Sequence, residues 1–210
     1  MINTMSYSTL LAGVTGSGKS FAADKIIQHL IHEGNALLVL IDPKKVEQRE
    51  YRLNPATLWY ADDEDKIYET FCKVHDMMLS RLDAIPEGEK VSSEPHTFVC
   101  VDEMAFLMQS SKKRDYVKMI GDIAIMGRAA HIHLVLCTQV CTQDVIPAVI
   151  RDNVANIVCL RQRDAGKYRY LLGSAPGRLP LIGYAYVLTP NMDRPEKVKT
   201  EDIWKMIDNR

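Results

Sequence analysis

A run of eight residues near the amino terminus has the residue types and the spacing needed to bind a chain of phosphates. It fills the pattern G-x-x-x-x-G-K-[ST], and its members are Gly13, Val14, Thr15, Gly16, Ser17, Gly18, Lys19 and Ser20. Glycines let backbone N–H groups surround a phosphate, the lysine reaches the outer phosphates, and the serine hydroxyl can ligate Mg²⁺. The run therefore predicts a site for a nucleoside triphosphate, with Ser20 as a ligand of its magnesium ion.

The segments on either side of this phosphate loop fit the same chemistry. Residues 8–12 are typical of a buried strand, and residues 21–31 carry an apolar stripe at helical spacing. A strand that runs into a glycine-rich turn and then a helix aims backbone N–H groups and the positive end of the helix dipole at one spot. A glycine-rich turn without a ligand is the alternative, and this context disfavours it.

Two acidic residues at the end of an apolar run could complete a hydrolytic site. Residues 97–101 predict a buried strand, and Asp102 and Glu103 follow it directly. Open α/β sheets bind their ligands at the carboxyl ends of the strands. We expect Asp102 to orient Mg²⁺ through a water molecule and Glu103 to act as general base for the attacking water. The alternative, a strand that ends in two solvated acids, is disfavoured by the phosphate loop upstream.

A third polar strand end could respond to the terminal phosphate. Residues 133–138 predict a strand, and Gln139 follows it. If this strand lies between the phosphate-loop strand and the strand of Asp102, Gln139 faces the γ-phosphate. There it could bond the attacking water or sense hydrolysis. The alternative is a polar strand end that bonds only to nearby backbone.

Short apolar runs alternate with helical stretches along the chain, which is typical of βαβ units. We expect strands at residues 7–12, 36–41, 57–60, 97–102, 133–138, 155–160 and 181–188. Apolar residues at helical spacing predict further helices over 67–85 and 117–127. The acidic residues 62–65 fit the amino-terminal cap of a helix better than a metal site. The predicted fold class is α/β, a mostly parallel sheet with helices on both faces.

The bulk composition limits the remaining possibilities. The chain has 210 residues, 47% of them hydrophobic and 25% charged, and we expect one domain over residues 1–210. Because the net charge is −1, any contact with nucleic acid must come from a local patch. The amino terminus lacks a signal peptide, and the most apolar run, 36–41, is too short to cross a bilayer. We therefore expect a cytoplasmic protein with no membrane segment of its own.

Cysteine and histidine do not favour a metal or a disulfide role. Three of the five cysteines lie in strand-like runs, where a reduced thiol acts as a small core side chain. Cys137 and Cys141 lack the second pair that a zinc site needs. His131 and His133 lead directly into a predicted strand, with no third ligand cluster beside them.

Taken together, these segments resemble the FtsK/SpoIIIE family of DNA translocases. The pieces that match, in the family's order, are residues 11–20, 41–44, 101–103 and 128–139, followed by 144–146 and 151–153. The most specific piece, RAAHIHLVLCTQ at 128–139, is similar to the family's RAAGIHLVLATQ. The resemblance extends from about residue 8 to residue 190.

The resemblance implies a RecA-like P-loop ATPase that uses ATP and Mg²⁺. The family assembles as a hexameric ring and pumps double-stranded DNA through its pore. Arg128 matches a position that we interpret as an arginine finger reaching the γ-phosphate of a neighbouring subunit. An arginine that only serves a local helix dipole is the alternative.

The chain departs from the family in several places. The family's Gln-Arg-Pro after the sensor strand is Gln-Val-Cys at 139–141, which removes a positive charge from a pore loop. Only twelve residues precede Gly13, so the family's preceding motor subdomain is not seen. A winged-helix module and membrane-spanning segments are not seen either. We therefore expect a minimal motor core.

Two basic stretches are candidates for contact with DNA. The first holds Lys112, Lys113 and Arg114, which we expect in a loop after the acidic pair. The second begins at Arg151 and continues through residues 161–169. A solvated basic surface is the alternative for each. Six copies around a pore would concentrate such patches, so that a chain of net charge −1 could still hold DNA.

Two other functions remain open at this point. Secretion-system ATPases carry similar cores and move protein, and a nucleotide-dependent scaffold could bind ATP and assemble without translocating. The combination of Lys19, Asp102 and Glu103 disfavours the scaffold, which does not need a complete hydrolytic set. A response of ATP hydrolysis to DNA would separate the DNA motor from the protein motor.

Overall fold

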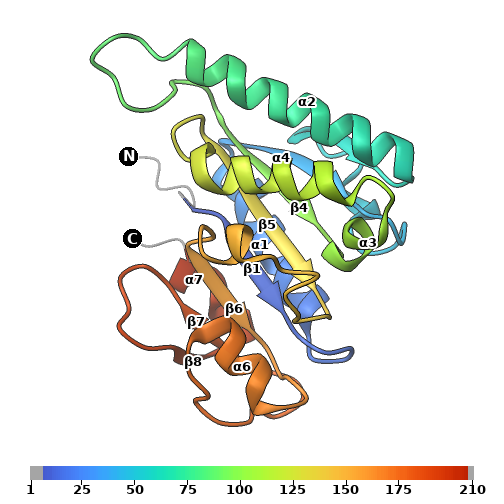
Figure 1. The fold of residues 1–210 in the computed structure, drawn as a ribbon, viewed down its shortest axis with the longest axis vertical. Coiled ribbons are helices and arrows are strands. Elements are labelled where there is room, and N and C mark those ends of the chain that lie inside the picture. The colour runs from blue at the N-terminus through green and yellow to red at the C-terminus, as the bar shows by residue number, and fades with distance from the viewer. Residues whose placement is uncertain (1–6, 208–210) are drawn as a thin grey trace.

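The framework of the protein is one eight-stranded sheet, seen in a computed structural model that describes residues 7–207 (Figure 1). The strands are β1 (Thr9–Ala12), β2 (Ala36–Ile41), β3 (Thr57–Ala61), β4 (His96–Val101), β5 (Ile132–Thr138), β6 (Asn156–Cys159), β7 (Tyr184–Leu188) and β8 (Glu196–Lys199). Their order across the sheet is β3-β2-β4-β5-β1-β6-β7-β8. The first six strands of this order are parallel, and β7 runs antiparallel to both of its neighbours.

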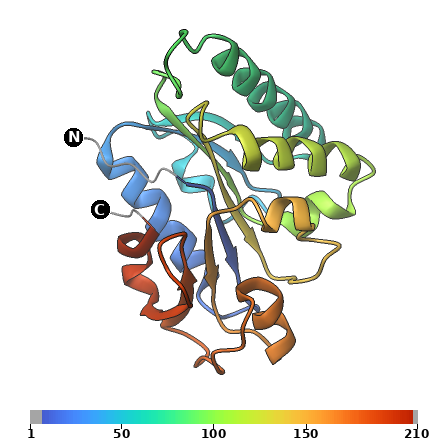
Figure 2. The ribbon, with the colours of Figure 1, turned by 60° about the vertical axis from the view of Figure 1, so that its left-hand side comes forward.

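Helices cover both faces of this sheet, as Figure 2 shows. They are α1 (Lys19–Glu33), α2 (Glu64–Asp83), α3 (Met104–Gln109), α4 (Lys113–Met126), α5 (Ala148–Arg151), α6 (Ala165–Leu172) and α7 (Ile203–Ile207), with 3-10 turns at Arg49–Tyr51 and Thr200–Asp202. One hydrophobic core joins the sheet to α2, α3, α4 and α6, and a second joins it to α1 and α7. Alternate residues of each buried strand enter opposite cores, as the pleat of a strand requires. The predicted sheet with helices on both faces is confirmed.

Most of the expected elements are present, with shifts at their ends. The seven predicted strands all occur, but the last begins at Tyr184 rather than at residue 181. The helix predicted over 67–85 spans Glu64–Asp83, and Asp63 caps it by accepting a hydrogen bond from the Lys66 backbone N–H at 2.9 Å. Strand β8 and helix α7 were not predicted, because both are short and β8 is largely exposed.

The position of β5 decides one open expectation. Within the sheet β5 pairs with β4 on one side and with β1 on the other. It therefore lies between the phosphate-loop strand and the strand that leads to Asp102, which is the arrangement required for Gln139 to face the γ-phosphate.

Within residues 7–207, no helix is long and apolar enough to cross a membrane.

The turn from α4 into β5 leaves no room for a side chain at Gly127. A Cβ atom on Gly127 would collide with the backbone oxygens of Ile123 and Ile132, neither of which can move without breaking the turn. We expect Gly127→Ala to lower the free energy of unfolding by about 1–3 kcal/mol, the usual cost of overpacking. Urea denaturation measures this change.

Gly121 in the same helix supplies the matched control. A Cβ there meets only Val149 methyl groups, at 3.4 and 3.6 Å, which is ordinary van der Waals contact. Alanine is favoured over glycine in a helix by roughly 0.5–1 kcal/mol, so Gly121→Ala should leave the protein as stable or more so. Equal losses in the two variants would contradict the packing described for this turn.

Candidate active site

The phosphate loop links the end of β1 to the start of α1. Its first two N–H groups donate to neighbouring strand ends, Gly13 to the Thr138 carbonyl and Val14 to the Arg161 carbonyl, both at 3.1 Å. A Cβ on Gly13 would lie 2.5 Å from the Ser17 hydroxyl oxygen and 2.8 Å from the Leu160 Cβ, so only glycine fits. The Ser17 hydroxyl is buried and makes no hydrogen bond to a described residue. This orphaned group fits a loop shaped to receive a phosphate.

The strand β4 delivers Asp102 to the same edge of the sheet. Lys19 Nζ donates to the Asp102 carbonyl oxygen at 3.3 Å and lies 3.9 Å from its Oδ1. The Asp102 side chain is only 3% exposed. Burial raises the pKa of its carboxyl group above the usual value, and the charges of Lys19 and Lys44 act in the opposite direction. The loop lysine and the acidic strand end are thus in direct contact at one edge of the sheet, where both could reach a magnesium–triphosphate.

Glu103 and Gln139 meet beside the phosphate loop. Glu103 Oε1 accepts from the backbone N–H of Ala105 at 3.4 Å, which caps α3, and from that of Gln139 at 3.2 Å. The Gln139 side-chain oxygen accepts from the Thr15 hydroxyl of the loop at 2.6 Å. A hollow of about 270 Å³ opens here, lined in part by Val14, Thr15 and Gln139. The Gln139 side chain therefore bonds to the phosphate loop and is not limited to contacts with nearby backbone.

Lys44, which was not predicted as a site residue, lies beside Asp102 and Glu103. Its Nζ lies 3.2 Å from Asp102 Oδ2 and 3.6 Å from Glu103 Oε2. Burial alone would lower the pKa of this ammonium group, but the two carboxylates outweigh burial and raise it. The sheet explains this contact: β2 and β4 are neighbours with Ile41 opposite Val101, so the residues that follow the two strands lie close together, and no local pattern in the sequence indicates that pairing.

The donors at this edge suit Mg²⁺. Ser20 supplies a hydroxyl and Asp102 a carboxylate, and Mg²⁺ prefers such oxygen ligands, with water and substrate phosphates completing its shell. Among residues 7–207, no group of three or more His, Cys, Asp or Glu side chains could hold a metal ion unaided. An ion that enters together with the nucleotide fits this donor set.

Arg128 lies at the opposite edge of the sheet. It follows α4, precedes β5, is exposed, and holds its guanidinium 4.7 Å from the centre of the Tyr7 ring. The seven residues of β5 separate this edge from Gln139, a length of roughly 23 Å at the usual rise per residue. Arg128 therefore does not reach the phosphate loop of its own chain.

The DNA candidates fall into two separate groups. The expectation of a loop at 112–114 was wrong in part: Lys112 immediately precedes α4, while Lys113 and Arg114 lie in the first turn of that helix. Lys112 is bound to Asp65 at 3.1 Å and lies over the Tyr68 ring. Within the described chain, Lys113 and Arg114 have no recorded ion pair.

Arg151, the first residue of the second basic stretch, is the last residue of α5. Its Nε donates to Asp152 at 2.7 Å, and its guanidinium lies 4.7 Å from the centre of the Tyr170 ring. With Arg169 it lines a hollow of about 820 Å³. The two basic stretches thus have different partners: Lys112 contacts Asp65 and Tyr68, whereas Arg151 contacts Asp152 and Tyr170.

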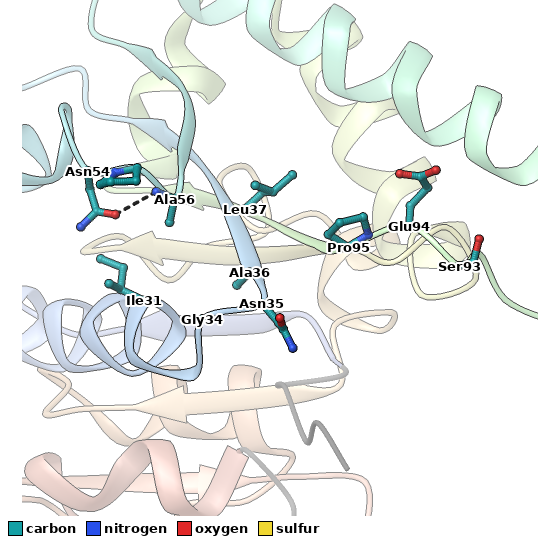
Figure 3. Close-up of a pocket in the computed structure, with 11 residues that line it drawn as sticks. Ile31, Gly34, Asn35, Ala36, Leu37, Asn54, Ala56, Ser93, Glu94 and Pro95 are labelled. Carbon is teal, nitrogen blue, oxygen red and sulfur yellow. Dashed lines mark hydrogen bonds between the residues drawn. The ribbon is translucent and has the colours of Figure 1, made fainter.

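A further hollow, of about 760 Å³, lies far from this chemistry (Figure 3). It is formed by the end of α1, the start of β2, and residues 54–56 and 93–95. None of its lining residues belongs to the phosphate loop or to the acidic pair. This hollow lies at the amino ends of β2, β3 and β4, whereas the residues suited to bind a nucleotide lie at the carboxyl ends of the parallel strands.

Comparison with known proteins identifies relatives of this chain. Residues 2–52 match the family model described as the central domain of helicase HerA. The chain is 33% identical over 200 residues to the DNA translocase FtsK of Oceanobacillus iheyensis, which covers 83% of this chain and 25% of that protein. The chain thus spans about a quarter of the length of such curated relatives.

Two solved structures share the fold. One is the pCW3 conjugation coupling protein TcpA with ATPγS, with a TM-score of 0.77 and 23% identity over 99% of this chain and 64% of that one. The other is the type VII secretion ATPase EccC of Thermomonospora curvata, with a TM-score of 0.72 and 19% identity over 93% of this chain and 25% of that one. These two similarities confirm the predicted fold, a mostly parallel sheet of the RecA-like P-loop ATPase type.

Glu103 offers the sharpest test of the site, because glutamine keeps the oxygen that caps α3 and removes only the charge. We expect Glu103→Gln to bind Mg-ATP and to lose about 10²–10⁴ in turnover, the usual worth of a positioned base. Calorimetry and steady-state ATP hydrolysis measure the two effects. Lys19→Ala is the comparison, since it should lose tight ATP binding itself. Normal turnover in Glu103→Gln would move water activation elsewhere, with Gln139 the next candidate.

Proposed function

Because this chain belongs to the FtsK/SpoIIIE family, we propose that it is the ATP-driven core of a motor that translocates double-stranded DNA as a hexameric ring. The single observation that supports this proposal most is the position of β5, which joins Gln139 to Thr15 of the phosphate loop and to Glu103. A nucleotide-dependent scaffold has no need for a sensor held between loop and base. We also propose that residues 1–210 form a single motor domain.

In the proposed reaction each group has one task. Lys19 and the loop N–H groups bind the β- and γ-phosphates, and Ser20 and Asp102 hold Mg²⁺, Asp102 through a water molecule. The ion, when bound, neutralises charge on the phosphate oxygens. Gln139 orients the attacking water. As the water oxygen bonds to the γ-phosphorus and the bond to the bridging oxygen breaks, Glu103 takes the water's proton, leaving ADP and phosphate.

Arg128 can join these catalytic groups only at an interface between two subunits. The length of β5 keeps it away from its own phosphate loop, yet an exposed guanidinium at the opposite edge is available to a neighbour. Subunits that pack head to tail in a closed ring bring such opposite edges together. In this arrangement Arg128 stabilises the charge that spreads over the neighbour's γ-phosphate, an effect worth roughly 10³–10⁵ in rate in other phosphate-loop enzymes.

The basic groups give the proposed ring a surface for DNA. Lys113 and Arg114 are the stronger candidates, because within the described chain neither has a recorded acidic partner. Lys112 and Arg151 are already paired, with Asp65 and Asp152 respectively. Contacts of this kind are to phosphates, so they position the duplex without reading its sequence.

Duplex DNA should stimulate ATP hydrolysis by the wild-type chain, and its binding should weaken steeply with salt. Each lost phosphate contact lowers the slope of log affinity against log salt by about one, so Lys113→Ala/Arg114→Ala should lower it by about two. The control Lys197→Ala/Lys199→Ala removes the same charge from β8. An ATPase rate that does not change with DNA but rises with a protein substrate would support the protein motor instead.

The shared site can be tested by mixing variants. Arg128→Ala and Lys19→Ala subunits should each be inactive alone, but a mixture forms interfaces with an intact loop and an intact Arg128, so part of the ATPase rate should return. A mixture of Arg128→Ala with Lys19→Ala/Arg128→Ala contains no intact interface and should stay inactive. Full activity from a dilute monomer, or no recovery in mixtures shown to co-assemble, would rule out action in trans.

A further inference from the structure

The acidic pair of the site already holds a cation that belongs to the chain. Lys44 Nζ contacts Asp102 Oδ2 at 3.2 Å and Glu103 Oε2 at 3.6 Å. Lys19 also approaches Asp102, but through the other oxygen, Oδ1. The two oxygens that face Lys44 are therefore distinct from those used by the loop lysine and by the cap of α3.

The backbone that carries Lys44 is fixed. Asp42 is fully buried, its Oδ2 accepts from the Gln48 backbone N–H at 3.1 Å and from the Tyr60 hydroxyl at 3.3 Å, and its carbonyl accepts from the Lys45 N–H at 3.0 Å. Lys45 adopts a left-handed conformation, with φ of 61°, to close this turn. The Lys44 side chain, in contrast, is 41% exposed. Its flexible four-carbon stem can move its charge into solvent without disturbing the turn.

The same oxygens are needed by the loaded site. Asp102 must face Mg²⁺, and Glu103 must offer a free carboxylate oxygen to water. Glu103 Oε1 is engaged by the N–H groups of Ala105 and Gln139, so Oε2 is the oxygen left for a proton. The ammonium group of Lys44 and a hydrated dication cannot occupy one place between two carboxylates, because they need the same oxygens and like charges repel each other.

We propose that Lys44 is a built-in counter-ion that holds Asp102 and Glu103 in the nucleotide-free protein and is displaced when the metal–nucleotide enters. This inference rests on the proposed function of the site and assigns a positioning role to a residue outside the phosphate loop and the acidic strand end. Displacement frees Glu103 Oε2 at the moment when ATP is bound, so the base becomes available only in a loaded site. Lys44 thereby couples loading to activation.

Binding of a divalent metal together with a non-hydrolysable ATP analogue tests this role without ATP hydrolysis or DNA. Mn²⁺ serves as the probe, because the free ion can be counted by electron paramagnetic resonance. Removing a competing cation should tighten Mn²⁺ binding, so we expect Lys44→Ala and Lys44→Gln each to raise the affinity about tenfold, which corresponds to about 1.4 kcal/mol of relieved charge repulsion. Lys44→Arg keeps the charge and should return the affinity close to the wild-type value.

Lys45→Asn is the matched control, since it removes one positive charge from the next residue and keeps a side chain that tolerates the left-handed backbone. Lys45 pairs with Asp62 rather than with the acidic pair, so its Mn²⁺ affinity should stay within about twofold of wild type, the small effect of a screened surface charge. Unchanged or weaker Mn²⁺ binding in both Lys44→Ala and Lys44→Gln would overturn the proposal. A gain in Lys45→Asn equal to that in Lys44→Ala would overturn it as well. Failure of DNA to stimulate ATPase activity would contradict the motor and leave this measurement intact.

Discussion

The pairing of three neighbouring parallel strands is the constraint on which the rest of the site depends. Val101 of β4 lies opposite Leu136 of β5, and Thr138 of β5 lies opposite Ala12 of β1. Because side chains alternate between the faces of a sheet, a slip of one residue would turn every apolar side chain of a strand toward the wrong core. Both cores hold this register, and the register in turn brings the loop, the acidic pair and Gln139 to one edge.

At that edge the structure accommodates buried charge, which a protein tolerates only where it is paired. Lys19 and Lys44 approach different oxygens of Asp102, so the carboxylate is compensated from two sides. The hydroxyl of Ser17 remains buried without a partner among the described residues. The buried charge of Asp102 is therefore compensated, whereas the Ser17 hydroxyl lacks a hydrogen-bond partner. This combination suits a ligand that brings both phosphate oxygens and a cation.

The sequence predicts those features that depend on local spacing. The phosphate loop, the buried strand before Asp102 and the helix capped by Asp63 each carry their signal within a few residues. Features set by contacts between distant segments carry no such signal. Lys44 meets Glu103 only because β2 and β4 are neighbours. Helix α4 begins with three charged residues, Lys113, Arg114 and Asp115, which a search for apolar periodicity does not assign to a helix. Strand β8 pairs only with β7, and its four residues include three exposed charged side chains, so its pattern resembles a loop.

In the proposed ring, one strand carries parts of two successive sites. Gln139 follows the carboxyl end of β5 and contacts its own phosphate loop, whereas Arg128 precedes the amino end and serves the neighbour. Every residue of β5 is buried, and a close-packed core does not let such a strand bend independently. Because β5 is also paired with β1 and β4, a change at Gln139 on hydrolysis would move the whole sheet and its helices as a rigid body against the adjoining subunit. The exposed Arg128, which has a ring contact with Tyr7, would move with that body. Communication between neighbouring sites then follows from the placement of both groups on a single rigid element and requires no separate relay.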